Sequence, residues 1–140
     1  MTRVDFYILD DSDPMAALHY ACRLIEKAYR GGHRVCVRTE NQSQAQQLDA
    51  LLWTYRGEAF IPHSSEDAAE AIYIDAGGNP GEHSDVLVNL GTALPDHFSR
   101  FKRLAEIVCQ QPQWLQASRE RYALYKHRGY PLHTHSISES

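Results

Sequence analysis

The first part of the chain alternates short apolar runs with longer segments in which apolar residues recur every three or four positions. Val4–Leu9 is rich in aromatic and β-branched residues and leads into a cluster of aspartates, which is typical of a buried strand that ends in an exposed loop. Asp13 is suited to cap a helix that has proline at its first position, and a glycine pair follows the last apolar position. We therefore predict a strand over Val4–Leu9 and a helix over Pro14–Arg30.

The same alternation continues through the middle of the chain. The polar run from Asn41 opens a second helix, whose apolar side is formed by Leu48, Leu51, Leu52 and Tyr55. Short β-branched or apolar runs bounded by turn residues predict further strands. These strands are expected at Val35–Thr39, Ala59–Ile61, Ala71–Ile74 and Val86–Leu90.

The last part of the chain is predicted to be helical. Spacings of three and four residues favour a helix between residues 98 and 108, marked by Phe98, Phe101, Leu104, Ala105 and Val108. Pro112 opens a final helix that runs to about His127. From His133 the sequence HTHSISES has no periodicity that would form a core, so residues 133–140 are expected to be a mobile tail.

Strands that alternate with helices through short connections predict right-handed crossovers and a mostly parallel sheet. The expected fold class is therefore α/β, a three-layer Rossmann-like domain whose sheet is flanked by helices. With 140 residues and 43% hydrophobic residues the chain can bury a core of its own, and we expect one domain over residues 1–132.

Charge and cysteine content narrow the functional classes. The net charge is −4 and no segment is strongly basic, which disfavours direct binding to duplex DNA. Cys22, Cys36 and Cys109 are odd in number, widely spaced and without a CxxC pair, so neither a disulfide framework nor a zinc knuckle is indicated. Cys22 and Cys36 stand at apolar-periodic positions and are predicted to be core thiols. The first residues contain no apolar stretch of the length of a signal peptide or membrane span, so a reducing cytoplasm is the expected location.

The loop after the first strand lacks the features of a nucleotide site. Dinucleotide-binding domains place a glycine-rich turn there, because backbone amides must approach the pyrophosphate at a helix N-terminus. Here the turn reads DDSDP, and its carboxylates would repel a phosphate. No nucleotide or other cofactor is therefore expected.

Asp11 and Asp13 keep one enzymatic alternative open. A strand followed by DxD is where haloacid-dehalogenase-like phosphatases carry a nucleophile, an acid and magnesium. Met15 stands where such an enzyme would carry a hydroxyl, and no second acidic pair follows VLVNL, so we favour Asp13 as a helix cap. His133 and His135 could share a metal and His63 could act as a base, but no partner residues are spaced to support either role.

The final helix carries an unusual row of side chains. At 100° per residue, Leu115, Tyr122 and Lys126 lie within about 60° of Arg119 on a helical wheel. Trp114, Ala117 and Leu124 lie on the other side and form the expected core face. The outward row suits a short acidic peptide with an apolar end, although it could also be a solvated face whose arginines pair with Glu120.

Five segments spread over the chain resemble the chi subunits of the bacterial DNA polymerase III holoenzyme in order and spacing. They read FYILDD, RGGHRVCVRTEN, QLDALLWTYRGEAFIPH, DVLVNLG and ASRERYALYKHRGY, and LDxxLW followed by FxPH is the most specific part. The resemblance implies a Rossmann-like domain without catalytic activity, which agrees with the absent phosphate loop.

The resemblance also implies partners and sites. Chi subunits pair with the psi subunit, which ties them to the clamp loader, and they bind the acidic C-terminal tail of single-stranded DNA-binding protein (SSB). Arg119 and Tyr122 match the tail-binding positions, and Lys126 matches a basic neighbour. Trp53 and Phe60 match apolar positions used toward psi and, in some bacteria, toward a helicase. The alternative for both is that they are ordinary core residues.

This chain departs from the family pattern at two places. Leu115 and Ala123 stand where relatives carry lysines, so fewer cations face the tail. The segment between FIPH and the following strand is also shorter. These differences affect the expected strength of tail binding. The expected tail site consists of Leu115, Arg119, Tyr122 and Lys126.

Overall fold

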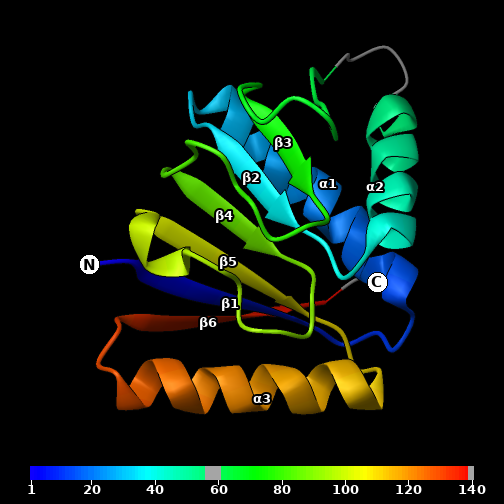
Figure 1. Ribbon diagram of the computed structural model, residues 1–140. Coiled ribbons are helices and arrows are strands. Elements are labelled where there is room, and N and C mark those ends of the chain that lie inside the picture. The colour runs from blue at the N-terminus through cyan, green and yellow to red at the C-terminus, as the bar shows by residue number, and fades with distance from the viewer. Residues whose placement is uncertain (56–60, 139–140) are drawn as a thin grey trace.

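The computed structural model describes residues 1–55 and 61–138. Within these residues six parallel strands form one sheet in the order β3-β2-β4-β5-β1-β6, and Figure 1 shows the sheet with β3 and β6 at its two edges. The elements are β1 (Arg3–Leu9), α1 (Pro14–Arg30), β2 (Val35–Arg38), α2 (Gln42–Thr54), β3 (Ile72–Asp75), β4 (Val86–Asn89), η1 (Phe98–Arg100), β5 (Arg103–Val108), α3 (Pro112–His127) and β6 (Leu132–Ile137). The predicted class, a Rossmann-like α/β fold, is confirmed.

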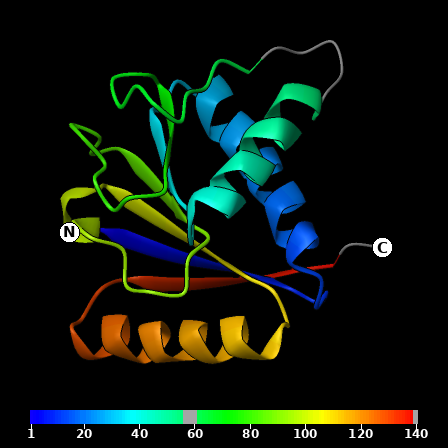
Figure 2. The same cartoon turned by 45° about the vertical axis from the view of Figure 1, so that its right-hand side comes forward.

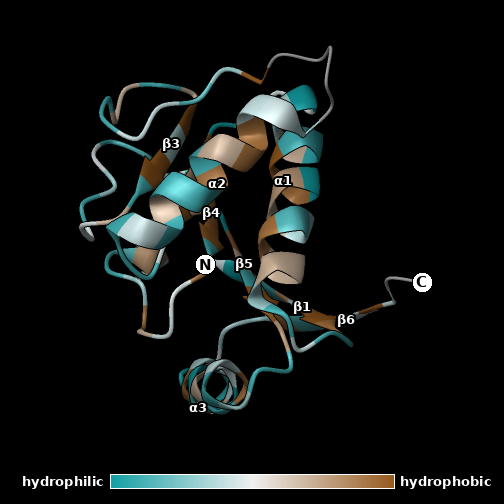
Figure 3. Cartoon of the chain, turned by 90° about the vertical axis from the view of Figure 1, so that its right-hand side faces the viewer, coloured by the Kyte–Doolittle hydropathy of each residue, from teal (hydrophilic) through white to brown (hydrophobic). Residues whose placement is uncertain are grey.

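The helices cover the sheet from both sides. Figures 2 and 3 show α1 and α2 on one face and α3 on the other. Two apolar clusters result, one that contains Leu18, Ile25 and Leu48 under α1 and α2, and one that contains Phe6 and Tyr125 under α3. β4 is buried at every position because it is covered on both faces, which explains its apolar run from Val86 to Val88.

Helices α1 and α2 each begin after a residue whose side chain caps the first turn. The carboxylate of Asp13 accepts a hydrogen bond from the backbone N–H of Met15 at 3.0 Å, and Pro14 holds the first helical position. Asn41 caps α2 by accepting from the N–H of Gln44 at 2.8 Å. Caps and prolines act within one turn of a helix, so the sequence alone can locate a helix start. The predicted bounds of α1 are confirmed, and α2 begins directly after its cap residue Asn41.

The predicted helix over residues 98–108 is wrong. A single turn, η1, is followed by strand β5, which pairs with β4 and β1 in the middle of the sheet. Leu104 and Val108 pack under α3, while Ala105 and Ile107 pack under α1. With both faces buried, the strand has no alternation of polar and apolar residues, and its apolar spacing imitates a helix.

The predicted mobile tail is also wrong for residues 133–137. They belong to β6, which pairs in parallel with β1 from Val4↔Leu132 to Leu9↔Ile137. β6 is an edge strand with several polar, exposed residues, so its backbone pairing leaves no apolar pattern in the sequence.

Three of the remaining predicted strands are confirmed with shifts of a residue or so, as β2, β3 and β4. The prediction at Ala59–Ile61 falls mostly outside the described residues, and Ile61 itself is buried without belonging to a strand. None of the helices in the described part of the chain has the length and apolar character needed to cross a membrane.

Candidate binding groove beside helix α3

Helix α3 buries side chains that its sequence pattern does not predict. Trp114, Ser118, Arg121 and Tyr125 are the buried residues of this helix. Of the expected core face, Trp114 is buried, but Ala117 and Leu124 are partly exposed. The prediction is therefore confirmed for Trp114 and in part for Leu124, which packs against the cluster under α3. It missed Arg121, which a buried carboxylate on β5 draws inward.

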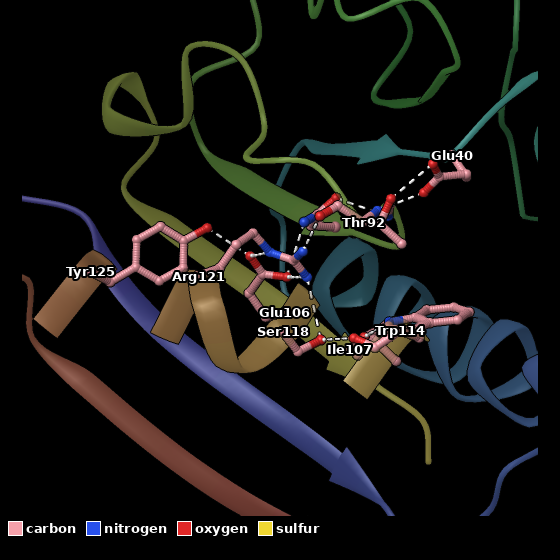
Figure 4. Close-up of polar contacts among 10 residues, drawn as sticks. Glu40, Thr92, Glu106, Ile107, Trp114, Ser118, Arg121 and Tyr125 are labelled. Carbon is pink, nitrogen blue, oxygen red and sulfur yellow. Dashed lines mark hydrogen bonds and ion pairs between the residues drawn. The ribbon is translucent and has the colours of Figure 1, made fainter. Parts of the chain in front are cut away.

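That carboxylate is Glu106, which is fully buried in the middle of the sheet. Arg121 holds both of its oxygens, each with a guanidinium nitrogen at 2.9 Å. The hydroxyl of Tyr125 donates to Glu106 at 2.6 Å, and the side-chain amide of Asn89 donates to it at 2.9 Å. Figure 4 shows this group between α3 and the sheet, with Arg121 also donating to the carbonyl of Thr92.

The charges of this network stabilise each other. Burial raises the pKa of Tyr125, and the neighbouring charge of Glu106 raises it further. Burial by itself would lower the pKa of Arg121, but the charge and hydrogen bonds of Glu106 outweigh burial and raise it. Arg121 and Glu106 therefore remain an ion pair, and their fixed geometry sets the rotation of α3 about its axis.

With α3 held in this way, the neighbouring row of the helix borders a groove of about 340 Å³, here called the α3 groove. It lies between α3 and the face formed by β5, β1 and β6. Its lining residues are Phe6, Ile8, Val108, Gln110, Leu115, Ser118, Arg119, Tyr122 and Thr134. The lining is mainly apolar, and Arg119 is its charged side chain.

The structure brings together three of the four residues predicted for the tail site. Leu115 and Tyr122 are half-buried and rest on the apolar cluster under α3, where the rings of Tyr122 and Phe6 meet edge to face with centroids 5.2 Å apart. Arg119 is exposed between them. Lys126 is exposed one helical turn beyond Tyr122 and does not line the groove.

The opposite wall of the α3 groove was not found from sequence. Phe6 and Ile8 alternate along β1 and therefore share a face, which could have marked them. Val108 and Thr134 come from segments predicted as a helix and a tail, so nothing in the sequence placed them beside α3.

One of the two positions assigned to psi, Trp53, lies at the far end of α2. Trp53 is 54% exposed, so it is not part of the core, and its ring lies 4.9 Å from that of His63. His63 in turn contacts the carboxylate of Asp49 at 3.0 Å and the carbonyl of Ile61 at 2.7 Å. His63 therefore supports the exposed tryptophan. Phe60 lies outside the described residues.

In the loop where a Rossmann-like domain would hold a nucleotide, the chain's own residues form hydrogen bonds with one another. Between the carboxyl ends of β1 and β5, Gln110 donates from its side chain to the carbonyl of Leu9 at 2.8 Å and from its backbone to Asp11 at 2.7 Å. The side chain of Asp11 accepts from the N–H of Asp13 at 2.8 Å. Asp11 and Asp13 thus act as turn and cap residues.

The two histidines considered for a shared metal, His133 and His135, both lie on β6. His135 lies with Nε2 at 2.9 Å from Asp5, a carboxylate that also contacts Arg3 and Arg103. Across residues 1–55 and 61–138 no three metal-binding side chains come together.

Comparison with known proteins gives a consistent family. The family model described as DNA polymerase III chi subunit, HolC, matches residues 1–133. The chain is 45% identical over 139 residues to DNA polymerase III subunit chi of Pseudomonas aeruginosa, which covers 98% of each protein. It is 30% identical to the subunit of the same name from Escherichia coli, over 96% of this chain and 97% of that protein. The Haemophilus influenzae subunit is 28% identical over 94% and 95%.

Proposed function

The chain belongs to the family of DNA polymerase III chi subunits, and on this premise we propose that it links the clamp loader to DNA coated by SSB. The family is that of an accessory subunit and not a catalytic one. In this role the chain pairs with psi, which connects it to the clamp loader, and binds the acidic C-terminal tail of SSB. The chain is connected to DNA through these proteins rather than by binding DNA directly, because a net charge of −4 disfavours contact with phosphates.

The observation that carries this proposal is the α3 groove. It combines an apolar seat, formed by Leu115, Tyr122 and Phe6, with an exposed guanidinium at its mouth. An acidic tail that ends in an apolar side chain needs both features, because its carboxylates require a cation and its terminal ring requires an apolar surface.

The proposed binding mode uses each side chain for one part of the tail. Arg119 and Lys126 hold the terminal carboxylate and the acidic residues, and the terminal ring packs beside Tyr122 and Leu115. A short peptide buries little area and loses chain entropy on binding, so the dissociation constant is expected on the order of micromolar. Salt weakens such binding because the charges at the mouth of the groove are exposed to solvent.

The test is a low-salt titration of the protein with a fluorescently labelled SSB tail peptide. Replacement of Arg119 by Ala is expected to weaken binding roughly tenfold or more, because a hydrogen bond to a charged group contributes about 1.5–3 kcal/mol. Arg30→Ala serves as the control, since the Arg30 side chain is 62% exposed on α1, on the other side of the sheet. Unchanged tail binding by Arg119→Ala would show that the α3 groove is not the tail site.

For psi, the proposed contact is the exposed end of α2. Within the described residues the exposed large apolar side chains are Met1, Trp53 and Leu94, and Trp53 is the aromatic one. Tryptophan is enriched among residues that anchor interfaces. Phe60 is added from the family pattern.

Co-purification tests the psi contact. Psi is expected to be lost from preparations of the Trp53→Ala, Phe60→Ala double variant, while Leu94→Ala, which removes an exposed apolar side chain elsewhere, retains it. Retention of psi by the double variant would reject this interface.

A further inference from the structure

The two edge strands of the sheet, β3 and β6, differ in their backbone pairing. At the β3 edge, Ser64 forms a parallel bridge to Tyr73, with hydrogen bonds that join it to Ile72 and Ile74. At the other edge, β6 is the last strand of the sheet. The N–H of Val4 donates to the carbonyl of Pro131, so backbone groups at 131, 133, 135 and 137 point toward β1. Those of Leu132, Thr134 and Ser136 point outward, where another strand could pair.

Next to this edge, two adjoining cavities lie between one side of α1 and the sheet, and together we call them the α1 groove. Their volumes are about 280 Å³ and about 320 Å³, and they share Tyr7, Leu24 and Lys27. The second cavity reaches β6 at Ser136 and Ile137. The α1 groove therefore runs from the middle of the sheet to its open edge.

The lining of the α1 groove carries cations and no carboxylate. Lys27 borders both cavities, Arg103 borders one of them together with His33, and Arg23 borders the other. This is notable in a chain whose net charge is −4. Side chains from α1 and β5 create this concentration of positive charge, so it has no counterpart as a basic segment of the sequence.

Of these side chains, Arg23 and Lys27 are not neutralised by acidic neighbours, whereas His33 contacts the carboxylate of Asp85 at 3.2 Å. In the part of the chain that the structure describes, no ion pair involves Arg23 or Lys27, and both side chains are exposed. Arg103 directs Nε to the buried carboxylate of Asp5 at 3.1 Å and remains half-exposed. Asp5 is already surrounded by Arg3 and His135, so it balances little of the charge in the groove.

We propose that the edge of β6 and the α1 groove together bind an extended acidic peptide of a partner protein. The peptide adds a strand to β6 through the outward N–H and C=O groups of Thr134 and Ser136. Because side chains alternate along a strand, every second residue faces the α1 side of the sheet. Carboxylates at those positions meet Arg23 and Lys27. This site is on the opposite face of the sheet from the α3 groove.

A peptide fits these features better than single-stranded nucleic acid. The cations are few, and apolar residues, including Leu24, Ala28 and Ala105, lie between them. The ring of Tyr7 is stacked on His135, with centroids 4.8 Å apart, so it is not free to stack on a base.

The probe for this site is a fluorescein-labelled peptide in which Glu and Val alternate, titrated against the protein at low salt. The Arg23→Glu, Lys27→Glu double variant is expected to bind it at least about tenfold more weakly, because two attractive charges become repulsive. Lys102→Glu with Arg128→Glu is the control, since it changes the net charge equally at two exposed cations outside the α1 groove. Thermal unfolding checks that both double variants are folded.

Strand addition is tested with two further peptides, one N-methylated at every Val and the other at every Glu. In an added strand, alternate amides face β6, so one of these peptides is expected to lose binding while the other keeps it. Equal binding by both would overturn strand addition.

Three other results would overturn the proposed site. The control variant could weaken binding as much as the site variant, which would indicate unspecific attraction. Arg119→Ala could weaken it as much, which would place the probe in the α3 groove. A single-stranded oligothymidylate could displace the probe at lower concentration than unlabelled peptide does, which would indicate a nucleic-acid site.

Discussion

Arg119 and Arg121 are two residues apart on α3, yet one is exposed and the other is buried. Arg121 is 4% exposed and forms an ion pair with Glu106, which is itself fully buried. Arg119 is exposed at the α3 groove. Burial decides the difference, since a charge removed from water must be paired, while an exposed charge remains available to a ligand.

The stability of the protein is therefore expected to depend on Arg121 and not on Arg119. Arg121→Met leaves Glu106 as an unpaired buried charge and is expected to lower the free energy of unfolding by about 3–5 kcal/mol in urea titrations. Arg119→Met should change it by less than about 0.5 kcal/mol. Adding Glu106→Gln to Arg121→Met removes the unpaired charge and should recover part of the loss. Equal effects of the two arginine variants would contradict the assigned roles.

At the scale of elements, one carboxylate joins three neighbouring strands. Asp5 of β1 contacts Arg103 of β5 and His135 of β6, and it also pairs with Arg3. Burial raises the pKa of Asp5, but hydrogen bonds from His135, Arg3 and Arg103 outweigh burial and hold the pKa below its usual 3.8. The ionised carboxylate of Asp5 therefore helps to hold the polar edge strand β6 on the sheet.

This arrangement predicts a loss of stability in acid. Because the pKa of Asp5 is lower in the folded than in the unfolded protein, its contribution is complete above about pH 4 and disappears as the pH falls through the folded value. Urea unfolding from about pH 5 to about pH 2 should show a weaker pH dependence for Asp5→Asn than for the natural protein. The same pH dependence in both proteins would exclude this role.

Prediction from sequence succeeded where an element is defined by its own residues. The bounds of α1 follow from Asp13, Pro14 and the glycines after Arg30, all of which act locally. β5 and β6 were missed for opposite reasons. β5 is buried on both faces, so its apolar spacing imitates a helix, while β6 is polar and is held by backbone pairing to β1. In both cases the deciding partner is distant in sequence.

At the scale of the whole molecule, all three cysteines lie in the interior. Cys22 and Cys109 belong to the cluster under α1 and α2, and Cys36 belongs to the cluster under α3. Burial raises the pKa of Cys22 and of Cys36 to about 12, and it also raises the pKa of Cys109. The prediction of core thiols at Cys22 and Cys36 is confirmed.

Thiol reactivity reports this packing. The thiolate is the reactive form, so at about pH 8 the folded protein should react with 5,5′-dithiobis(2-nitrobenzoate) slowly, at a rate limited by opening of the fold. In urea all three thiols should react at once. A fast-reacting thiol in the folded protein would indicate that one of the clusters is open to solvent.

The sequence by itself determined the α/β class, the parallel sheet, the limits of α1 and α3, and three residues of the α3 groove, because periodicity, caps and helical spacing operate over a few residues. The tertiary structure alone decided the sheet positions of β5 and β6, the inward turn of Arg121 and the cations of the α1 groove. Each of these depends on a partner far along the chain: Glu106 for Arg121, β1 for β6, and α1 facing β5 for the groove.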